Sequence, residues 1–278
     1  RWGLVAYASS FDCIGPIAHN VEDNALLLEV MAGSDTHDST CSTNPVEAYT
    51  KAELSGNLKI GVLKQSFSEG VQPEIRDALK AKIEGWKAEG HTIEEVDFSL
   101  LDYLLNVYYI LTTAEASSNL SRFDGVRYGY RSEKATDLES LYKLSRSEGF
   151  GPEVKRRIML GTFVLSASYY DAYFTKAQKV RRLVKEQTEE LLSKFDFLVC
   201  PTTPTVAFGI NEKIDNPIEM YLNDIFTVQA NVCGIPAISI PLGENAEKLP
   251  FGLQIMAGSF QESKLLAFAK HNEISTLA

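Results

Sequence analysis

Cysteine is scarce in this chain, and its cysteines form no motif. The four lie far apart, without a Cys-x-x-Cys pair, at Cys13, Cys41, Cys200 and Cys233. Zinc-binding and disulfide-rich proteins place cysteines at short, regular spacings. The sequence therefore supports neither kind of site, and we expect four reduced cysteines, mostly in the core of a cytoplasmic protein.

Long apolar runs and a surplus of positive charge are also missing. No apolar stretch is long enough to cross a bilayer, and we expect neither a signal peptide nor membrane contact. The formal net charge is −10, from 27 basic and 37 acidic side chains. An acidic surface repels phosphate backbones, which disfavours nucleic acid as a direct partner of the whole surface. The chain begins without an initiator Met, and we expect that Arg1 is not its natural start.

Familiar catalytic and nucleotide-binding motifs are absent from the sequence. Its four histidines form no His-Glu-x-x-His run and no tight cluster, so metal catalysis has no support. No Gly-x-Ser-x-Gly elbow, phosphate-binding loop or Gly-x-Gly-x-x-Gly run occurs. A Cys–His dyad stays open, because its members could be distant in sequence, although solvated or packed histidines fit the pattern better.

The clearest secondary-structure pattern covers residues 59–98. Residues 59–63 and 92–98 have the composition of strands. Between them, Pro73 opens a helix whose apolar side chains recur at helical spacing until Gly90. This β-α-β pattern predicts a parallel sheet with helices packed against it. No linker or repeat divides the sequence, so we expect a single α/β domain over residues 1–278.

The remaining elements are predicted from shorter patterns. Asn20 has the side chain of a helix N-cap, and a helix should follow it. The helical pattern over residues 152–194 is too long for one helix, so we expect a break near Gly161 or residues 166–168. Other predicted elements are strands at 4–10, 197–200, 238–241 and 251–256, helices at 101–112, 217–234 and 262–275, and a loop at 117–129.

Three residues are candidates for a binding site, and each also has an ordinary explanation. Asp224 is expected between apolar groups on a helix face, where it could meet a cationic ligand group; the pattern favours a structural salt bridge or an exposed helix edge. Arg157 follows Glu153 by four residues, so a helix-surface ion pair explains it. Tyr108 continues a stripe of leucines, for which core packing is the default interpretation.

Several blocks of the sequence resemble amidase-signature enzymes. Residues 1–16 (RWGLVAYASSFDCIGP) are similar to the run that follows the Ser/Gly-rich signature of that family. Residues 234–243 (GIPAISIPLG) and 251–256 (FGLQIM) are shared across the superfamily. Residues 154–166 (VKRRIMLGTFVLS) resemble the A-subunit family of glutamyl-tRNA(Gln) amidotransferases in particular. Cys13 departs from the pattern, since many relatives have Gln there, and any polar role at that position is in doubt.

The resemblance implies an α/β fold with a mixed central β-sheet between helix layers, of which this chain would be the C-terminal part. The family's chemistry uses a Lys, a bridging Ser and a nucleophilic Ser. These lie upstream of the position that matches Arg1, so no catalytic residue can be carried over to this sequence. Because acyl transfer needs an activated nucleophile and oxyanion donors, we expect the isolated chain to be inactive.

The resemblance also implies substrate-binding residues and partners. In the A-subunit family an Arg holds the α-carboxylate of free glutamine and an Asp holds its α-ammonium group; the matching positions are Arg157 and Asp224. Tyr108 matches a tyrosine beside the amide. Companion B and C subunits are implied, and one of these partners would hold ATP, magnesium and most tRNA contacts, whereas no cofactor is expected in this chain. A stand-alone amidase and a non-catalytic assembly fragment remain as alternatives.

Overall fold

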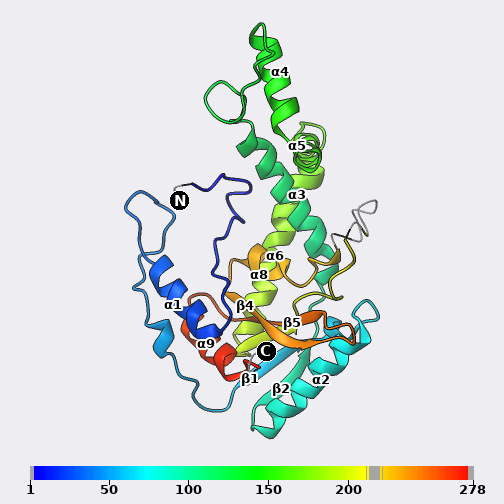
Figure 1. Ribbon diagram of the computed structural model, residues 1–278. Coiled ribbons are helices and arrows are strands. Elements are labelled where there is room, and N and C mark those ends of the chain that lie inside the picture. The colour runs from blue at the N-terminus through cyan, green and yellow to red at the C-terminus, as the bar shows by residue number, and fades with distance from the viewer. Residues whose placement is uncertain (1–2, 211, 213–219, 221, 275–278) are drawn as a thin grey trace. The chain divides into compact units, whose positions relative to one another are not determined.

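The computed structural model describes residues 3–210, 212, 220 and 222–274 (Figure 1). The chain divides into two compact units. We call Arg1–Cys13 with Asn106–Arg182 the helical unit, and Ile14–Leu105 with Leu183–Ala278 the sheet unit. Two helices, α3 (Leu101–Leu120) and α6 (Lys176–Leu192), continue from one unit into the other. The single domain expected from the sequence stays a prediction, and each unit is described by itself.

The sheet unit contains a five-stranded mixed sheet in the order β2-β1-β3-β5-β4. The strands are β1 (Lys59–Leu63), β2 (Thr92–Val96), β3 (Phe197–Pro201), β4 (Ala237–Glu244) and β5 (Pro250–Met256). Strand β1 pairs in parallel with β2 and β3, whereas β5 is antiparallel to β3 and β4. The mixed α/β fold class is therefore confirmed, as is the β-α-β unit over residues 59–98.

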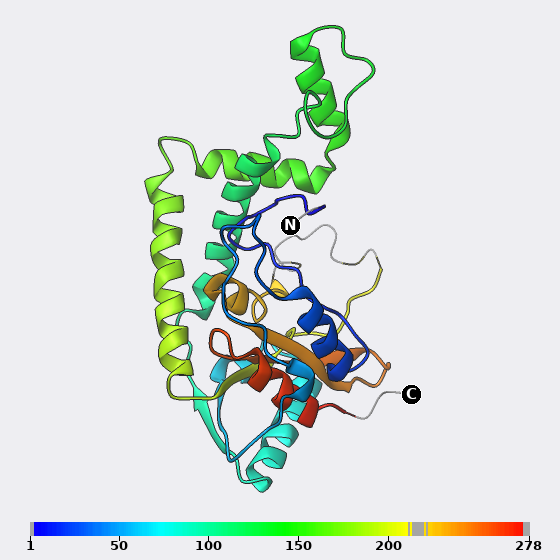
Figure 2. The same cartoon turned by 90° about the vertical axis from the view of Figure 1, so that its left-hand side faces the viewer.

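Helices cover both faces of this sheet (Figures 1 and 2). On one face lie α2 (Pro73–Ala88) and α9 (Glu262–His271), where the Phe268 ring stacks on Phe197 at 4.6 Å and lies 5.5 Å from Trp86. The short helix α8 (Val228–Cys233) lies across the sheet from them. Strand β3 is consequently buried along its whole length, as expected for a strand with both faces covered.

Helix α1 (Val21–Met31) packs against α9 in the same unit. Asn20 caps it as predicted, since the Asn20 side-chain oxygen accepts a hydrogen bond from the Asp23 backbone at 2.7 Å. Only Val21 and Ala25 of this helix are buried. The described part of the unit also contains short 3₁₀ turns at Tyr49–Lys51 and Lys64–Phe67.

The helical unit is built from α3, α4 (Leu138–Gly149), α5 (Pro152–Val164), a π-helical turn (Asp171–Thr175) and the start of α6. The predicted strand at residues 4–10 is wrong, because residues 3–13 carry no strand. Some of their backbone N–H groups bond to side chains instead, whereas those of Phe11 and Asp12 donate to the Ala8 carbonyl in a local turn. Those of Tyr7 and Ala8 donate to Asp12 at 3.0 and 3.1 Å, and that of Ser10 donates to Glu115 at 2.9 Å.

Other boundaries also differ from the sequence-based expectations. Helix α3 runs on to Leu120, into the expected loop, and α4 was not predicted. The break expected near Gly161 or residues 166–168 covers residues 165–170, so the second position is confirmed, whereas Gly161 stays inside α5. Pro217 lies outside the described residues, and α8 begins only at Val228. Helix α9 ends at His271, earlier than expected.

The four cysteines are free, and Cys200 and Cys233 are buried. Cys13 is exposed and Cys41 is half-buried, so the expectation of a mostly buried set holds for two of them. In the part of the chain that the structure describes, no helix combines the length and apolar character needed to cross a membrane.

Candidate functional site

Arg157 lies on α5, one turn after Glu153. Its Nε donates to the Glu153 carboxylate at 2.9 Å, and its Nη1 donates to the Tyr7 hydroxyl at 2.9 Å. The helix-surface ion pair expected from the four-residue spacing is therefore present. The contact with Tyr7 was not expected, because it joins residues 150 positions apart.

The environment of Arg157 keeps its guanidinium charged and oriented. Partial burial opposes the charge, but hydrogen bonds to Glu153 and Tyr7 outweigh this effect and raise the pKa of Arg157 above its usual range. The side chain is 28% exposed. A guanidinium has five N–H donors, and among the described residues only Glu153 and Tyr7 accept hydrogen bonds from it. Its other N–H groups can therefore meet an anion such as a carboxylate.

Tyr7 belongs to residues 7–12, which we call the N-terminal segment. Asn119 of α3 fixes this segment: its amide donates to the Tyr7 carbonyl at 3.1 Å and to the Ser9 hydroxyl at 3.0 Å. Glu115, one turn earlier on α3, accepts from both the backbone and the hydroxyl of Ser10. The segment is thus attached to α3 by side chains that take the place of a strand ladder.

Tyr108 also lies on α3 and contacts the other end of the N-terminal segment. Its ring meets that of Phe11 edge-on, with centroids 5.8 Å apart, and a second edge-on contact joins it to Tyr109. The Arg181 guanidinium lies 4.2 Å from the centre of the Phe11 ring, on which it packs. Tyr108 is half-buried rather than a full core residue. Arg157 and Tyr108 therefore both touch the same short segment, at its two ends.

Asp224 belongs to the sheet unit. It lies in the turn before α8, where its carbonyl accepts hydrogen bonds from Thr227 and Val228, each at 3.1 Å. The expectation that it lies within a helix starting at Pro217 therefore needs correction, and Tyr221, its expected neighbour, lies outside the described residues. Because Asp224 is in one unit and Arg157 and Tyr108 are in the other, the convergence of all three on one ligand stays a prediction.

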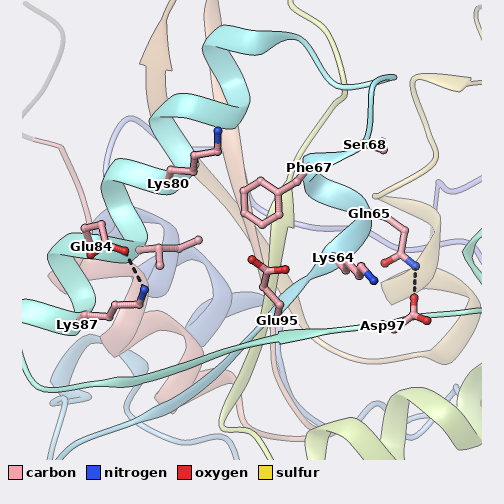
Figure 3. A pocket seen from close by; sticks show the side chains of 10 residues that line it. Lys64, Gln65, Phe67, Ser68, Lys80, Glu84, Lys87, Glu95 and Asp97 are labelled. Atoms are coloured by element: carbon pink, nitrogen blue, oxygen red, sulfur yellow. Dashed lines mark hydrogen bonds and ion pairs between the residues drawn. The ribbon is translucent and has the colours of Figure 1, made fainter.

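A cavity of about 720 Å³ lies elsewhere, at the carboxyl ends of β1 and β2 (Figure 3). Several of its charged side chains pair with neighbours: Lys87 with Glu84 at 2.8 Å, and Asp97 with Gln65 at 2.8 Å. None of the three candidate residues lines it. We interpret it as a polar hollow beside α2, in which half of the polar lining residues pair with one another.

Residues that support the candidate site could not be found from the sequence. Tyr7 and Ser10 fell within the strand predicted at residues 4–10, Asn119 fell within the loop predicted at residues 117–129, and Glu115 lay between that loop and the preceding predicted helix. Among the described residues, no group of three or more His, Cys, Asp or Glu side chains lies close enough together to hold a metal ion. The arrangement around Arg157 instead fits recognition of an organic anion.

Comparisons with known proteins place these residues in a family. The sequence model described as "Amidase" matches residues 1–266. The chain is 51% identical to the glutamyl-tRNA(Gln) amidotransferase A subunit of Chlorobium luteolum, over 98% of this chain and 56% of that protein. It is 52% identical to the corresponding protein of Pelodictyon phaeoclathratiforme, over 99% of this chain and 58% of that protein. The chain thus spans little more than half the length of these relatives.

A solved structure agrees with the sequence comparisons. The crystal structure of the glutamyl-tRNA(Gln) amidotransferase A subunit from Thermotoga maritima superposes with a TM-score of 0.77 at 36% identity, covering 100% of this chain and 56% of that one. Its fold accounts for the mixed sheet and the flanking helices. Since the family model matches nearly every residue of the sequence, the chain belongs to the amidase family.

Proposed function

We propose that this chain is the glutamine-recognising part of a glutamyl-tRNA(Gln) amidotransferase A subunit. The main support is Arg157, a half-buried guanidinium whose orientation is set by two hydrogen bonds and which retains N–H groups for a ligand. The names of relatives about 50% identical point to the same role. In this proposal Arg157 binds the α-carboxylate of glutamine, Asp224 its α-ammonium group, and Tyr108 lies beside the side-chain amide.

The chemical logic follows from the charges of the substrate. Free glutamine is a zwitterion, so a site with one fixed cation and one fixed anion selects it over an uncharged amide. A hydrogen bond to a charged group contributes about 1.5–3 kcal/mol. Two such contacts would separate the two substrates by roughly two orders of magnitude or more.

In this proposal the catalytic groups lie outside residues 1–278. A serine oxygen attacks the amide carbon of glutamine, ammonia leaves, and water hydrolyses the resulting glutamyl ester to glutamate. In the proposal, the nucleophilic serine, the bridging serine and the lysine come from the region upstream of the position that matches Arg1. Ammonia passes to companion B and C subunits in the cytoplasm, where ATP and magnesium activate glutamate on tRNA.

The proposal is tested by replacing Arg157→Ala in the full-length protein that contains this chain. Turnover of glutamine and of a simple uncharged amide is measured side by side. We expect kcat/KM for glutamine to fall about 10- to 100-fold, because a charge-assisted contact is lost, while the uncharged amide is hydrolysed as before. Arg156→Ala is the matched control, since Arg156 also bonds to Glu153, at 2.6 Å, but lies more exposed.

Three outcomes would contradict the proposal. Equal loss of both activities, or loss of neither, would favour a stand-alone amidase that needs no charge clamp. Absence of any amide hydrolysis, together with retention of the companion subunits in a pull-down, would favour a non-catalytic assembly role.

A further inference from the structure

We propose that Tyr7 is a positioning residue for Arg157 and thereby sets the affinity of the site for the substrate α-carboxylate. The inference rests on the proposed function, because it assigns a role relative to the carboxylate-binding arginine. Tyr7 touches the guanidinium rather than the substrate. Its role is to fix the direction in which the remaining N–H groups point.

Tyr7 holds the guanidinium through two contacts. The Tyr7 hydroxyl accepts a hydrogen bond from Arg157 Nη1 at 2.9 Å, and the guanidinium carbon lies 5.6 Å from the centre of the Tyr7 ring. An arginine side chain has several rotatable bonds and loses roughly 2 kcal/mol of rotamer entropy when it is fully fixed. A partner that fixes it before the ligand arrives lowers the cost of binding.

The other partner of Arg157 is less suited to this task. Glu153 lies on the same helix, has 45% of its side chain exposed, and also accepts a hydrogen bond from Arg156. Glu153 therefore contacts the Arg157 guanidinium from the same helix, and Arg156 competes for its carboxylate. The Tyr7 hydroxyl lies outside α5. Its hydrogen bond reaches the Arg157 guanidinium from a second direction and so fixes the plane of the group.

Tyr7 can position Arg157 because it is itself fixed. Its backbone N–H donates to Asp12 at 3.0 Å, and its carbonyl accepts from Asn119 at 3.1 Å. Asn119 lies on α3, the helix that also carries Tyr108. Tyr7 therefore fixes the orientation of Arg157 on α5 relative to α3, the helix that carries Tyr108.

The test is Tyr7→Phe in the full-length protein that contains this chain. The variant keeps the ring and removes only the hydroxyl. Kinetics are measured with glutamine and with its α-carboxamide, which lacks the α-carboxylate but keeps the α-ammonium group and the scissile amide. We expect the KM for glutamine to rise about 5- to 10-fold, less than for loss of a direct contact with the carboxylate, because Tyr7→Phe removes only a group that positions Arg157. The kcat should change less than two-fold, and the KM for the α-carboxamide should not change.

Tyr130→Phe is the matched control. The Tyr130 hydroxyl belongs to the same unit and donates to Glu148 at 2.9 Å rather than meeting Arg157. The control removes a comparable hydrogen bond between a tyrosine and a charged side chain, and we expect it to leave both substrates unaffected.

A double-substitution cycle separates this inference from the proposed function. If Arg157→Ala does not selectively weaken glutamine, the proposed function fails. If Arg157→Ala is selective but Tyr7→Phe is not, only the positioning role is overturned. The same conclusion follows if Tyr7→Phe impairs both substrates equally, or is as harmful in the Arg157→Ala background as in the native protein, because either result indicates a merely structural role.

Discussion

Asp196 shows how a single carboxylate connects several elements of the sheet unit. It immediately precedes β3, and its side chain accepts a hydrogen bond from the Lys59 backbone at the start of β1 at 2.7 Å. It also pairs with Lys264 of α9. Partial burial raises the pKa of Asp196, but the hydrogen bonds from Lys264 and Lys59 outweigh it, and the pKa is lowered overall. The ionised form therefore stabilises the folded state.

We expect Asp196→Asn to lower the free energy of unfolding by about 1–2 kcal/mol near pH 7, because a hydrogen-bonded charge is lost. The folded-state pKa lies below the ordinary value of about 3.9. The stabilisation is therefore complete above that value and disappears as the pH falls through the folded-state pKa. Urea unfolding between pH 7 and pH 3 measures it, with Asp77→Asn of the exposed Lys80 pair as the control. A difference that is unchanged at the lowest pH would contradict the role of the charge.

At the scale of helices and strands, regular patterns were predicted well and irregular segments were not. The buried positions of α2 and the β-α-β order followed from apolar spacing, because packing against a sheet imposes that spacing. The strand predicted at residues 4–10 failed because its apolar composition is also compatible with a coil fixed by Asp12, Glu115 and Asn119. Composition did not report burial here, since Leu4 and Val5 are 50% and 55% exposed, and it does not report which groups satisfy the backbone.

Gly161 illustrates an interface between helices that sequence patterns conceal. A Cβ at this position of α5 would lie 1.9 Å from the carbonyl oxygen of Thr113 on α3. One residue later, the Thr162 hydroxyl lies 2.9 Å from that of Ser117, also on α3. In the sequence Gly161 suggested a break, whereas in the structure it permits α5, which carries Arg157, to approach α3 closely.

We expect Gly161→Ala to lower the free energy of unfolding by about 1–3 kcal/mol, because the methyl group must push α5 away from α3. It should also weaken glutamine binding by displacing Arg157. Gly85→Ala is the control: Gly85 lies within α2, and a Cβ there would meet no atom within 4 Å, so alanine should raise stability by roughly 0.5–1 kcal/mol through helix propensity. Thermal unfolding of both variants and the KM for glutamine test this. Equal stabilisation by the two alanines would refute the close approach of α5 to α3.

At the scale of the whole molecule, the candidate site consists of residues that are far apart in the sequence and share no spacing pattern. For Arg157, Asp224 and Tyr108 local spacing favoured an ordinary structural role, and resemblance to a family is what assigned them to substrate binding. The structure adds the contacts that spacing cannot encode, above all that of Arg157 with Tyr7, 150 positions away. Such contacts depend on the path of the chain in three dimensions, so a periodic pattern contains no trace of them.

The division between recognition and chemistry leads to the last prediction. If residues 1–278 recognise glutamine while the nucleophile and its activating groups come from the upstream region of the family, the purified 278-residue chain should release no glutamate above the buffer background. The same chain extended by the upstream sequence of its own gene should turn over glutamine, and Arg157→Ala in that longer protein should remove most of this activity. Circular dichroism would establish that the short chain is folded. Glutamate release by the short chain alone would place a nucleophile within residues 1–278 and contradict the separation of the two roles.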